Sequence, residues 1–259
     1  MPGHLQLDIE GSVATLTLSH PGKLNAMSRA MWRELAQAVS SLRGQRGVRA
    51  LIVAGAGGHF CAGGDIGEYP GFRFDEASLR DFHERDVWGG LSALLDCELP
   101  VIAQIEGHCM GAGVEIASCC DLRVAGASAR FGAPIARLGF PMAPREAELV
   151  AREAGLATAR EMLLQAAVLD APTLLARGFL NAVVPDDQVA QDARRRADRA
   201  AELSPLAARL NKQTLRSLSF GRRAPELLAD AYGYADHAEH REGISAFLDK
   251  RPPAFQALP

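Results

Sequence analysis

The sequence predicts an α/β fold in which strands and helices alternate, followed by a helical C-terminal region. The runs at residues 50–53 and 101–105 are typical of buried strands, further strand positions are expected at 49 and 121–125, and helical spacing lies between these segments. This alternation favours stacked β-α units with helices covering parallel strands. After Ala133 the pattern becomes mostly helical. With 259 residues, of which 48% are hydrophobic, the chain suits one globular domain with a helical appendage.

A hairpin is expected to open the fold. Residues 5–9 and 13–18 carry apolar side chains in alternation or clusters, and residues 10–12 form a tight polar turn between them. Ser28 is a plausible N-cap, and helical spacing continues from it to the breaker Gly44. The first helix is therefore predicted directly after the hairpin.

The remaining elements are expected to be mainly helices. A loop at residues 70–74 precedes a helix at about 75–96, and its glycine and aromatics suit either a lid over the acyl group of a ligand or, more simply, an ordinary surface turn. Beyond Ala133, helices are expected at residues 145–153, 157–164, 172–177, 187–203, 205–218 and 223–247, with 181–184 as one extended piece.

Composition excludes several classes of function. No apolar run approaches the roughly 18 residues of a membrane span and the N-terminus lacks the features of a signal peptide, so a cytoplasmic protein without membrane contact is expected. The five cysteines form no C-x-x-C pair and predict buried reduced thiols, with no metal site. The one basic run, residues 194–196, is flanked by Asp192 and Asp198, and the net charge is -3. No nucleic-acid partner is therefore expected.

Two glycine-rich loops each follow a predicted strand. Residues 107–120 combine a glycine-rich turn with the start of a helix, and residues 55–65 form the second loop. Unpaired amides at such ends can bind an oxygen that gains negative charge. If the strand ends are neighbours, the amides of Ala62 and Ala112 converge on one carbonyl oxygen. Glu115 lies one helical turn after Ala112 and adds a potential base.

Either loop alone is weak evidence, because close helix packing and nucleotide phosphate loops produce similar strings. The sequences FCAGGD at 60–65, GHCMGAGVE at 107–115 and CDLRVA at 120–125 together resemble the signature blocks of the enoyl-CoA hydratase/isomerase (crotonase) family. Further matches are PGKLNAM at 21–27, ARFG at 129–132 and GISAFLDKRPP at 243–253. The resemblance covers nearly the whole chain. It is specific for fold and thioester binding and less specific for the reaction.

The resemblance implies a crotonase-like β-β-α spiral core over residues 1–200. Residues 201–259 would form a C-terminal helical region for trimerisation and active-site covering, giving a homotrimer or a hexamer built as a dimer of trimers. It also implies an acyl-CoA thioester substrate, in which coenzyme A is part of the substrate and no cofactor is bound. Fatty acid metabolism is the implied setting.

The resemblance assigns catalytic roles to three residues. Ala62 and Ala112 would donate their amides to the thioester oxyanion, and losing one such donor typically costs on the order of 3 kcal/mol in the barrier. Glu115 would be the acid or base. Capping or pairing is the structural alternative for Glu115, but an idle acid beside apolar neighbours is costly to bury, and such surroundings raise the pKa of a carboxyl.

The second acid of the hydratases is missing. It follows a Phe-Gly-x-Pro segment in the family, and here that position is Ile135, which cannot carry a proton. Glu146 or Glu148 can substitute from the altered loop that follows, although both are better placed to cap or decorate the helix that they begin. Efficient two-acid hydration is therefore in question.

Further residues are candidates for substrate binding by resemblance. Ala62, Gly63, Gly64 and Asp65 belong to the first loop, where a loop-stabilising role for Asp65 is an equal alternative. Ala112 and Ile135 are also candidates for substrate binding. Lys23 and Lys250 lie in the terminal blocks, where basic residues often meet the CoA phosphates, although each also suits a plain surface lysine.

Two classes of function follow. The first is an acyl-CoA enzyme of the hydratase/isomerase type that nominally hydrates trans-2-enoyl-CoA. Within this class, Ile135 favours a one-acid reaction: double-bond isomerisation, thioester hydrolysis or decarboxylation. The second class is a catalytically weak CoA-binding or RNA-associated scaffold, against which Glu115 and both loops argue.

Overall fold

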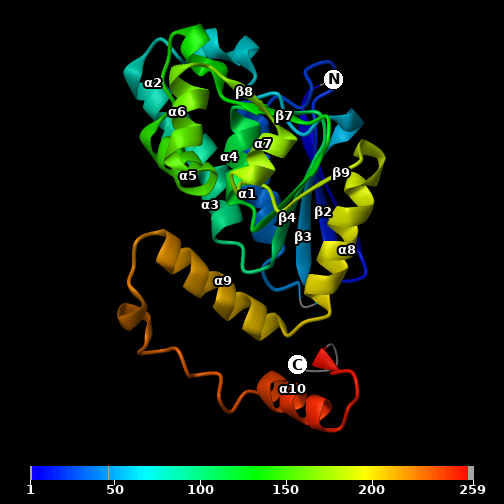
Figure 1. Ribbon diagram of the computed structural model, residues 1–259. Helices are drawn as coiled ribbons and strands as arrows, with labels where there is room; N and C mark the ends of the chain where they lie inside the picture. The colour runs from blue at the N-terminus through cyan, green and yellow to red at the C-terminus, as the bar shows by residue number, and fades with distance from the viewer. Residues whose placement is uncertain (1, 46, 256–259) are drawn as a thin grey trace.

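The computed structural model describes residues 2–45 and 47–255 and contains two β-sheets surrounded by helices (Figure 1). The six-stranded sheet, in spatial order, consists of β1 (His4–Glu10), β2 (Val13–Ser19), β3 (Ala50–Gly55), β4 (Val101–Ile105), β6 (Leu122–Gly126) and β9 (Ala182–Val184). The three-stranded sheet consists of β5 (His108–Met110), β7 (Arg130–Gly132) and β8 (Val168–Asp170).

The described part of the chain also contains ten α-helices and several shorter helical turns, which connect the strands or follow the last of them. The α-helices are α1 (Arg29–Ser41), α2 (Glu76–Asp81), α3 (Trp88–Leu95), α4 (Ala112–Cys119), α5 (Pro144–Ala154), α6 (Leu156–Leu164), α7 (Ala171–Ala176), α8 (Val189–Ala201), α9 (Pro205–Ser219) and α10 (Ala238–Leu248). The short turns are η1 (Ala56–Gly58), η2 (Ile66–Gly71), η3 (Phe82–Val87), η4 (Pro134–Leu138), η5 (Asp186–Gln188) and η6 (Ala224–Leu227).

The predicted hairpin and first helix are confirmed. Strands β1 and β2 pair antiparallel, with Leu7 opposite Leu16, and the later strands of the large sheet pair in parallel. Helix α1 begins after Ser28, whose hydroxyl accepts a hydrogen bond from the Met31 amide at 3.2 Å. This cap satisfies one of the amides that a helix start leaves without a partner.

The chain alternates between the two sheets, as the β-β-α spiral requires. After β4 in the large sheet it adds β5 to the small sheet and then forms α4. After β6 it adds β7 and then continues into η4 and α5. Strands β5 and β7 pair in parallel, so the segments that follow them emerge at the same edge. The α/β fold class is thereby confirmed, and the functional loops are brought to one end of the sheets.

Two layers of helix cover the large sheet. The main core lies between one face and helices that include α1, α3 and α4, and it contains the buried side chains of Trp32, Leu91 and Ile116. Helix α8 covers the other face, where Ala193 and Ala197 pack in a smaller cluster on the strands. Small residues on α8 let it lie close to the sheet.

Helices α9 and α10 extend away from the sheets (Figure 1). Lys212 ties α9 to the body by donating to the Leu99 carbonyl and to the Asp121 carboxylate, each at 2.7 Å. The predicted continuous helix at 223–247 is wrong, because only η6 and α10 are helical there. The segment between them is exposed throughout and buries no apolar face, so it lacks the packing that stabilises most helices in proteins.

None of the helices in the described residues combines the length and apolar character needed to span a bilayer. All five cysteines are buried free thiols, as expected.

Candidate active site

The two glycine-rich loops lie against each other. The Cys61 amide donates to the His108 carbonyl and the Met110 amide donates to the Cys61 carbonyl, each at 2.8 Å. Close approach requires glycine at position 113, because a Cβ there would lie 2.8 Å from the Cys61 oxygen. Gly111 has φ +47°, a conformation that side chains rarely adopt. The predicted meeting of the loops is therefore confirmed.

The amide of Ala62 is not available to a ligand. It donates to the Leu24 carbonyl at 2.9 Å, so the expectation that it binds the thioester oxygen is wrong. Sequence gives no means of telling which amide of a loop faces inward, because the answer depends on a contact with a segment almost forty residues earlier. The amide two residues further on, that of Gly64, is the alternative.

Gly64 sits in an isolated parallel bridge with Met27. The Met27 amide donates to the Gly63 carbonyl and the Asp65 amide donates to the Met27 carbonyl, both at 2.8 Å. In such a bridge the intervening amide points away from the partner strand. Among the described residues, the Gly64 amide donates to no protein acceptor, and Gly64 lines the pocket described below.

Ala112 supplies the second free amide. It is the first residue of α4, and the N-cap Gly111 offers no side chain to satisfy it. Within residues 2–45 and 47–255 the Ala112 amide has no acceptor, and Ala112 lines the same pocket. The amides of Gly64 and Ala112, one from each loop, thus form a pair of donors at the positive end of a helix.

These donors open into a largely apolar pocket of about 290 Å³. Its walls come from the two loops, from η2 and η3, and from η4 with the segment leading to α5. The pocket is lined by Trp32, Ala62, Gly63, Gly64, Ile66, Tyr69, Arg73, Phe82, His83, Val87, Met110, Gly111, Ala112, Glu115, Pro134, Ile135, Arg137, Leu138, Phe140, Pro141, Met142 and Ala143. Such a site is typical of small-molecule binding.

Glu115 is the acid closest to the donor pair along α4. Burial raises the pKa of its carboxyl to about 8, with a further increase from the neighbouring charge of Glu146 and an opposing decrease from Arg73. The residue is half-buried and lines the pocket. It is therefore poised to exchange a proton near neutral pH.

Arg73 is the cation that faces this carboxyl. Its guanidinium carbon lies 3.7 Å from the centre of the Phe140 ring and 4.5 Å from that of Tyr69. Burial lowers the pKa of the guanidinium from its usual value, although an arginine remains charged. Residues 70–74 therefore do contribute to the pocket, through Arg73, whereas Phe74 is exposed.

The altered segment after Ile135 places an acid in an unexpected position. Ile135 lines the pocket as expected. Glu146 is buried and its Oε1 lies 3.0 Å from Nδ1 of His83, so the interpretation of Glu146 as a helix cap or surface decoration is wrong. Glu148 is exposed, as that interpretation required. His83 was not a candidate in the sequence, because its partner lies 63 residues away.

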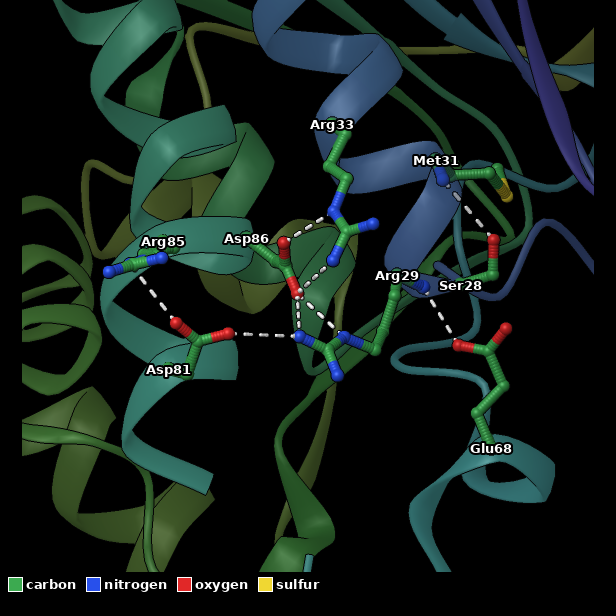
Figure 2. A network of polar contacts seen from close by, with 8 residues as sticks. All are labelled: Ser28, Arg29, Met31, Arg33, Glu68, Asp81, Arg85 and Asp86. Carbon is green, nitrogen blue, oxygen red and sulfur yellow. Dashed lines mark hydrogen bonds and ion pairs between the residues drawn. The ribbon is translucent and has the colours of Figure 1, made fainter. Parts of the chain in front are cut away.

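An ion-pair network fixes the turn that carries His83 (Figure 2). Asp86, in the same π-helical turn η3, is buried and pairs with Arg29 at 2.6 Å and Arg33 at 2.7 Å, both from α1. The backbone amide of Arg29 donates to the carboxylate of Glu68 on η2 at 2.8 Å, which joins η2 to the start of α1. Single π-turns inside helices are frequent at functional sites.

Of the residues proposed for CoA binding, some lie in or next to the first glycine-rich loop, whereas Lys250 lies far from the pocket wall in the sequence and does not line it. Lys23 pairs with Asp65 at 2.6 Å, and Asp65 also accepts from the Gly67 amide at 3.1 Å, which is the loop-stabilising alternative. Gly63 lies in the pocket wall, whereas Lys250 is exposed on the C-terminal segment and outside that wall. All residues that line the pocket lie between 32 and 143, so covering by the C-terminal region stays a prediction for an assembled protein.

In the described residues, no group of three histidine, cysteine, aspartate or glutamate side chains is arranged to hold a metal ion.

Comparison with known proteins agrees with this geometry. Residues 8–257 match the family model described as enoyl-CoA hydratase/isomerase. A probable enoyl-CoA hydratase of Mycobacterium bovis is 32% identical over 252 residues, which is 94% of each chain. An enoyl-CoA hydratase/carnithine racemase from Magnetospirillum magneticum has a TM-score of 0.92 at 35% identity, covering 97% of this chain and 94% of that one. An enoyl-CoA hydratase/isomerase family protein from Hyphomonas neptunium has a TM-score of 0.90 at 30% identity and 97% coverage of both. The chain belongs to the enoyl-CoA hydratase/isomerase family.

Proposed function

We propose that this protein adds water to the double bond of a 2-enoyl-CoA thioester. The observation that carries the proposal is the arrangement of one ionisable carboxyl, Glu115, one helical turn from the free amide of Ala112 and in the same pocket as that of Gly64. Hydration of an enoyl thioester creates negative charge on the carbonyl oxygen. Two preorganised amides stabilise that charge, and removing one such donor typically slows the reaction by about 10²- to 10³-fold.

Glu115 supplies the proton that the substrate needs at its α-carbon. Because the pKa of its carboxyl is about 8, it is mostly protonated at neutral pH and acts first as an acid. Its place in the same pocket as the Gly64 and Ala112 amides supports this role. The family membership and the names of the relatives support an enzyme acting on CoA thioesters.

The test is turnover of crotonyl-CoA, followed as loss of enoyl absorbance. The native protein is expected to hydrate this substrate, and Glu115→Gln is expected to lower kcat by about 10²- to 10⁴-fold with a small change in KM. Glu148→Gln is the matched control, because Glu148 is an exposed glutamate outside the pocket. A native protein without hydratase activity refutes the proposal.

Ile135 favours a second candidate reaction. With an aliphatic side chain in the pocket at this position, one carboxyl is sufficient for moving a double bond, because the same group removes and returns the proton. The discriminating assay offers a 3-enoyl-CoA and follows appearance of the 2-enoyl product. Isomerisation that depends on Glu115, without hydration, would replace the first proposal by this one.

A further inference from the structure

The pocket requires a base that Glu115 does not provide. Hydration moves two protons: one leaves the water and one reaches the α-carbon. A carboxyl that is mostly protonated near neutral pH delivers the second proton and is unable to take the first at the same time. At the position where a second acid was expected, Ile135 has no proton to exchange.

Only one other side chain in the described pocket wall is of a type that exchanges protons near neutral pH. The titratable groups that line the pocket are Glu115, Tyr69, Arg73, Arg137 and His83. The two arginines are permanent cations, and burial raises the pKa of Tyr69 above its ordinary value. Histidine is the residue type whose charge changes in the neutral range.

His83 is held in the orientation that a base requires. Its Nδ1 donates to the carboxylate of Glu146 at 3.0 Å, and the Glu146 side chain is only 3% exposed. This bond selects the tautomer whose other nitrogen, Nε2, carries a free lone pair. A buried carboxylate that orients a histidine in this way also stabilises the imidazolium when it forms.

Several other charged side chains surround the contact between His83 and Glu146. Glu115 on α4, Arg73 after η2 and Arg137 on η4 also line the pocket. Outside the pocket wall, Arg145 of α5 pairs with Glu84 of η3 at 3.1 Å and joins the two elements that carry His83 and Glu146. The ion pairs of Asp86 with Arg29 and Arg33 also hold η3 against α1 (Figure 2).

We propose that His83, oriented by the buried carboxylate of Glu146, is the base that activates water in this enzyme and replaces the acid missing at position 135. The inference rests on the proposed hydratase function. His83 is the catalytic residue, because it lines the pocket, and Glu146 is a positioning residue that acts through it.

The reaction step balances as follows. Nε2 of His83 takes one proton from water while the water oxygen bonds to the β-carbon. The electrons of the double bond move toward the thioester carbonyl, whose oxygen receives the amides of Gly64 and Ala112. Glu115 then gives its proton to the α-carbon. Return of the proton from the imidazolium to the Glu115 carboxylate, through solvent, restores the starting state.

The experiment compares His83→Gln, Glu146→Gln and the control Glu148→Gln with crotonyl-CoA. His83→Gln is expected to lower kcat by at least about 100-fold with KM within about threefold. Glu146→Gln is expected to lower kcat less than His83→Gln, with KM within about threefold, because the histidine loses the carboxylate that orients it. In the double variant His83→Gln/Glu146→Gln the second change is expected to have no further effect on kcat, whereas a purely structural role for Glu146 would lower kcat by the same factor in both backgrounds.

A double variant keeps the test decisive if His83→Gln is inactive. Adding Ile135→Glu to His83→Gln returns a carboxyl to the pocket and is expected to recover part of the lost activity, which also shows that the protein is folded. If His83→Gln stays within about threefold of the native kcat while Glu115→Gln is inactive, the inference is overturned and the hydratase proposal stands. If the native protein does not hydrate the substrate, the proposed function fails, and the role of His83 fails with it.

Discussion

Replacement of Glu115 by glutamine is expected to stabilise the protein at high pH and to leave its stability at low pH almost unchanged. The folded state raises the pKa of this carboxyl from 4.5 to about 8. Between pH 4.5 and about pH 8 the native state binds more protons than the unfolded chain, so the free energy of unfolding falls as the pH rises. Above about pH 8 the carboxyl is ionised in both states and the penalty is complete. Glutamine resembles the neutral acid and does not ionise, so the variant lacks this destabilisation at every pH.

The size of the effect follows from the same two values. A shift from 4.5 to about 8 corresponds to an upper limit of about 5 kcal/mol, at roughly 1.4 kcal/mol for each pKa unit. The carboxyl opens toward the pocket, where water screens part of its charge, so a gain of roughly 2–4 kcal/mol is expected for the variant at pH 9.

Urea denaturation of the native and Glu115→Gln proteins measures this gain, at fixed protein concentration and at steps between pH 4.5 and 9. The difference in the free energy of unfolding is expected to be near zero at the acidic end, to grow through the neutral range and to level off above about pH 8. Glu148→Gln should show no such rise, because its carboxylate is exposed. A difference that is constant with pH would refute the assignment of a buried, mostly protonated Glu115.

Three further changes test other parts of the structure. Arg73→Met removes the cation that lowers the pKa of Glu115, so the alkaline limb of the kcat profile is expected to move to higher pH; an unchanged limb would contradict that coupling. Phe247→Asp, on an α10 side chain that is 82% exposed, is expected to reduce the assembled mass in light scattering, and a monomeric native protein would contradict the predicted oligomer. Asp86→Asn leaves two arginines without their shared carboxylate and is expected to lower the free energy of unfolding by about 3 kcal/mol in urea titrations, whereas a loss below about 1 kcal/mol would show that the network contributes little.

Local patterns predicted most of the fold. Alternating apolar residues located the opening hairpin, and Ser28 marked the start of α1, because both features depend on neighbours within a few residues. The same logic failed at residues 228–237. Helical propensity there is not supported by any buried face, and helices of this length depend on packing that a sequence pattern does not report.

The candidate site was predictable only in part. Glu115 and Ala112 share one helix, so their spacing placed them on the same wall. The choice between Ala62 and Gly64 depends on the hydrogen bond that the Ala62 amide donates to the Leu24 carbonyl, which lies in another segment of the chain. His83 was missed for a similar reason, since a single histidine in a helical stretch carries no signal until its partner is known.

The pairing of His83 with Glu146 explains how the altered loop remains compatible with proton transfer. A carboxyl at position 135 would line the same pocket as Glu115, where each charge raises the pKa of the other group. Glu146, in the first turn of α5, is instead buried and contacts His83, while its charge also raises the pKa of Glu115. In the proposed arrangement His83 on η3 takes the role of a carboxyl at position 135, which follows β7, while the amide donors on the two glycine loops stay in place. A reaction that needs those donors can thus be retained while the group that handles the second proton changes chemical type.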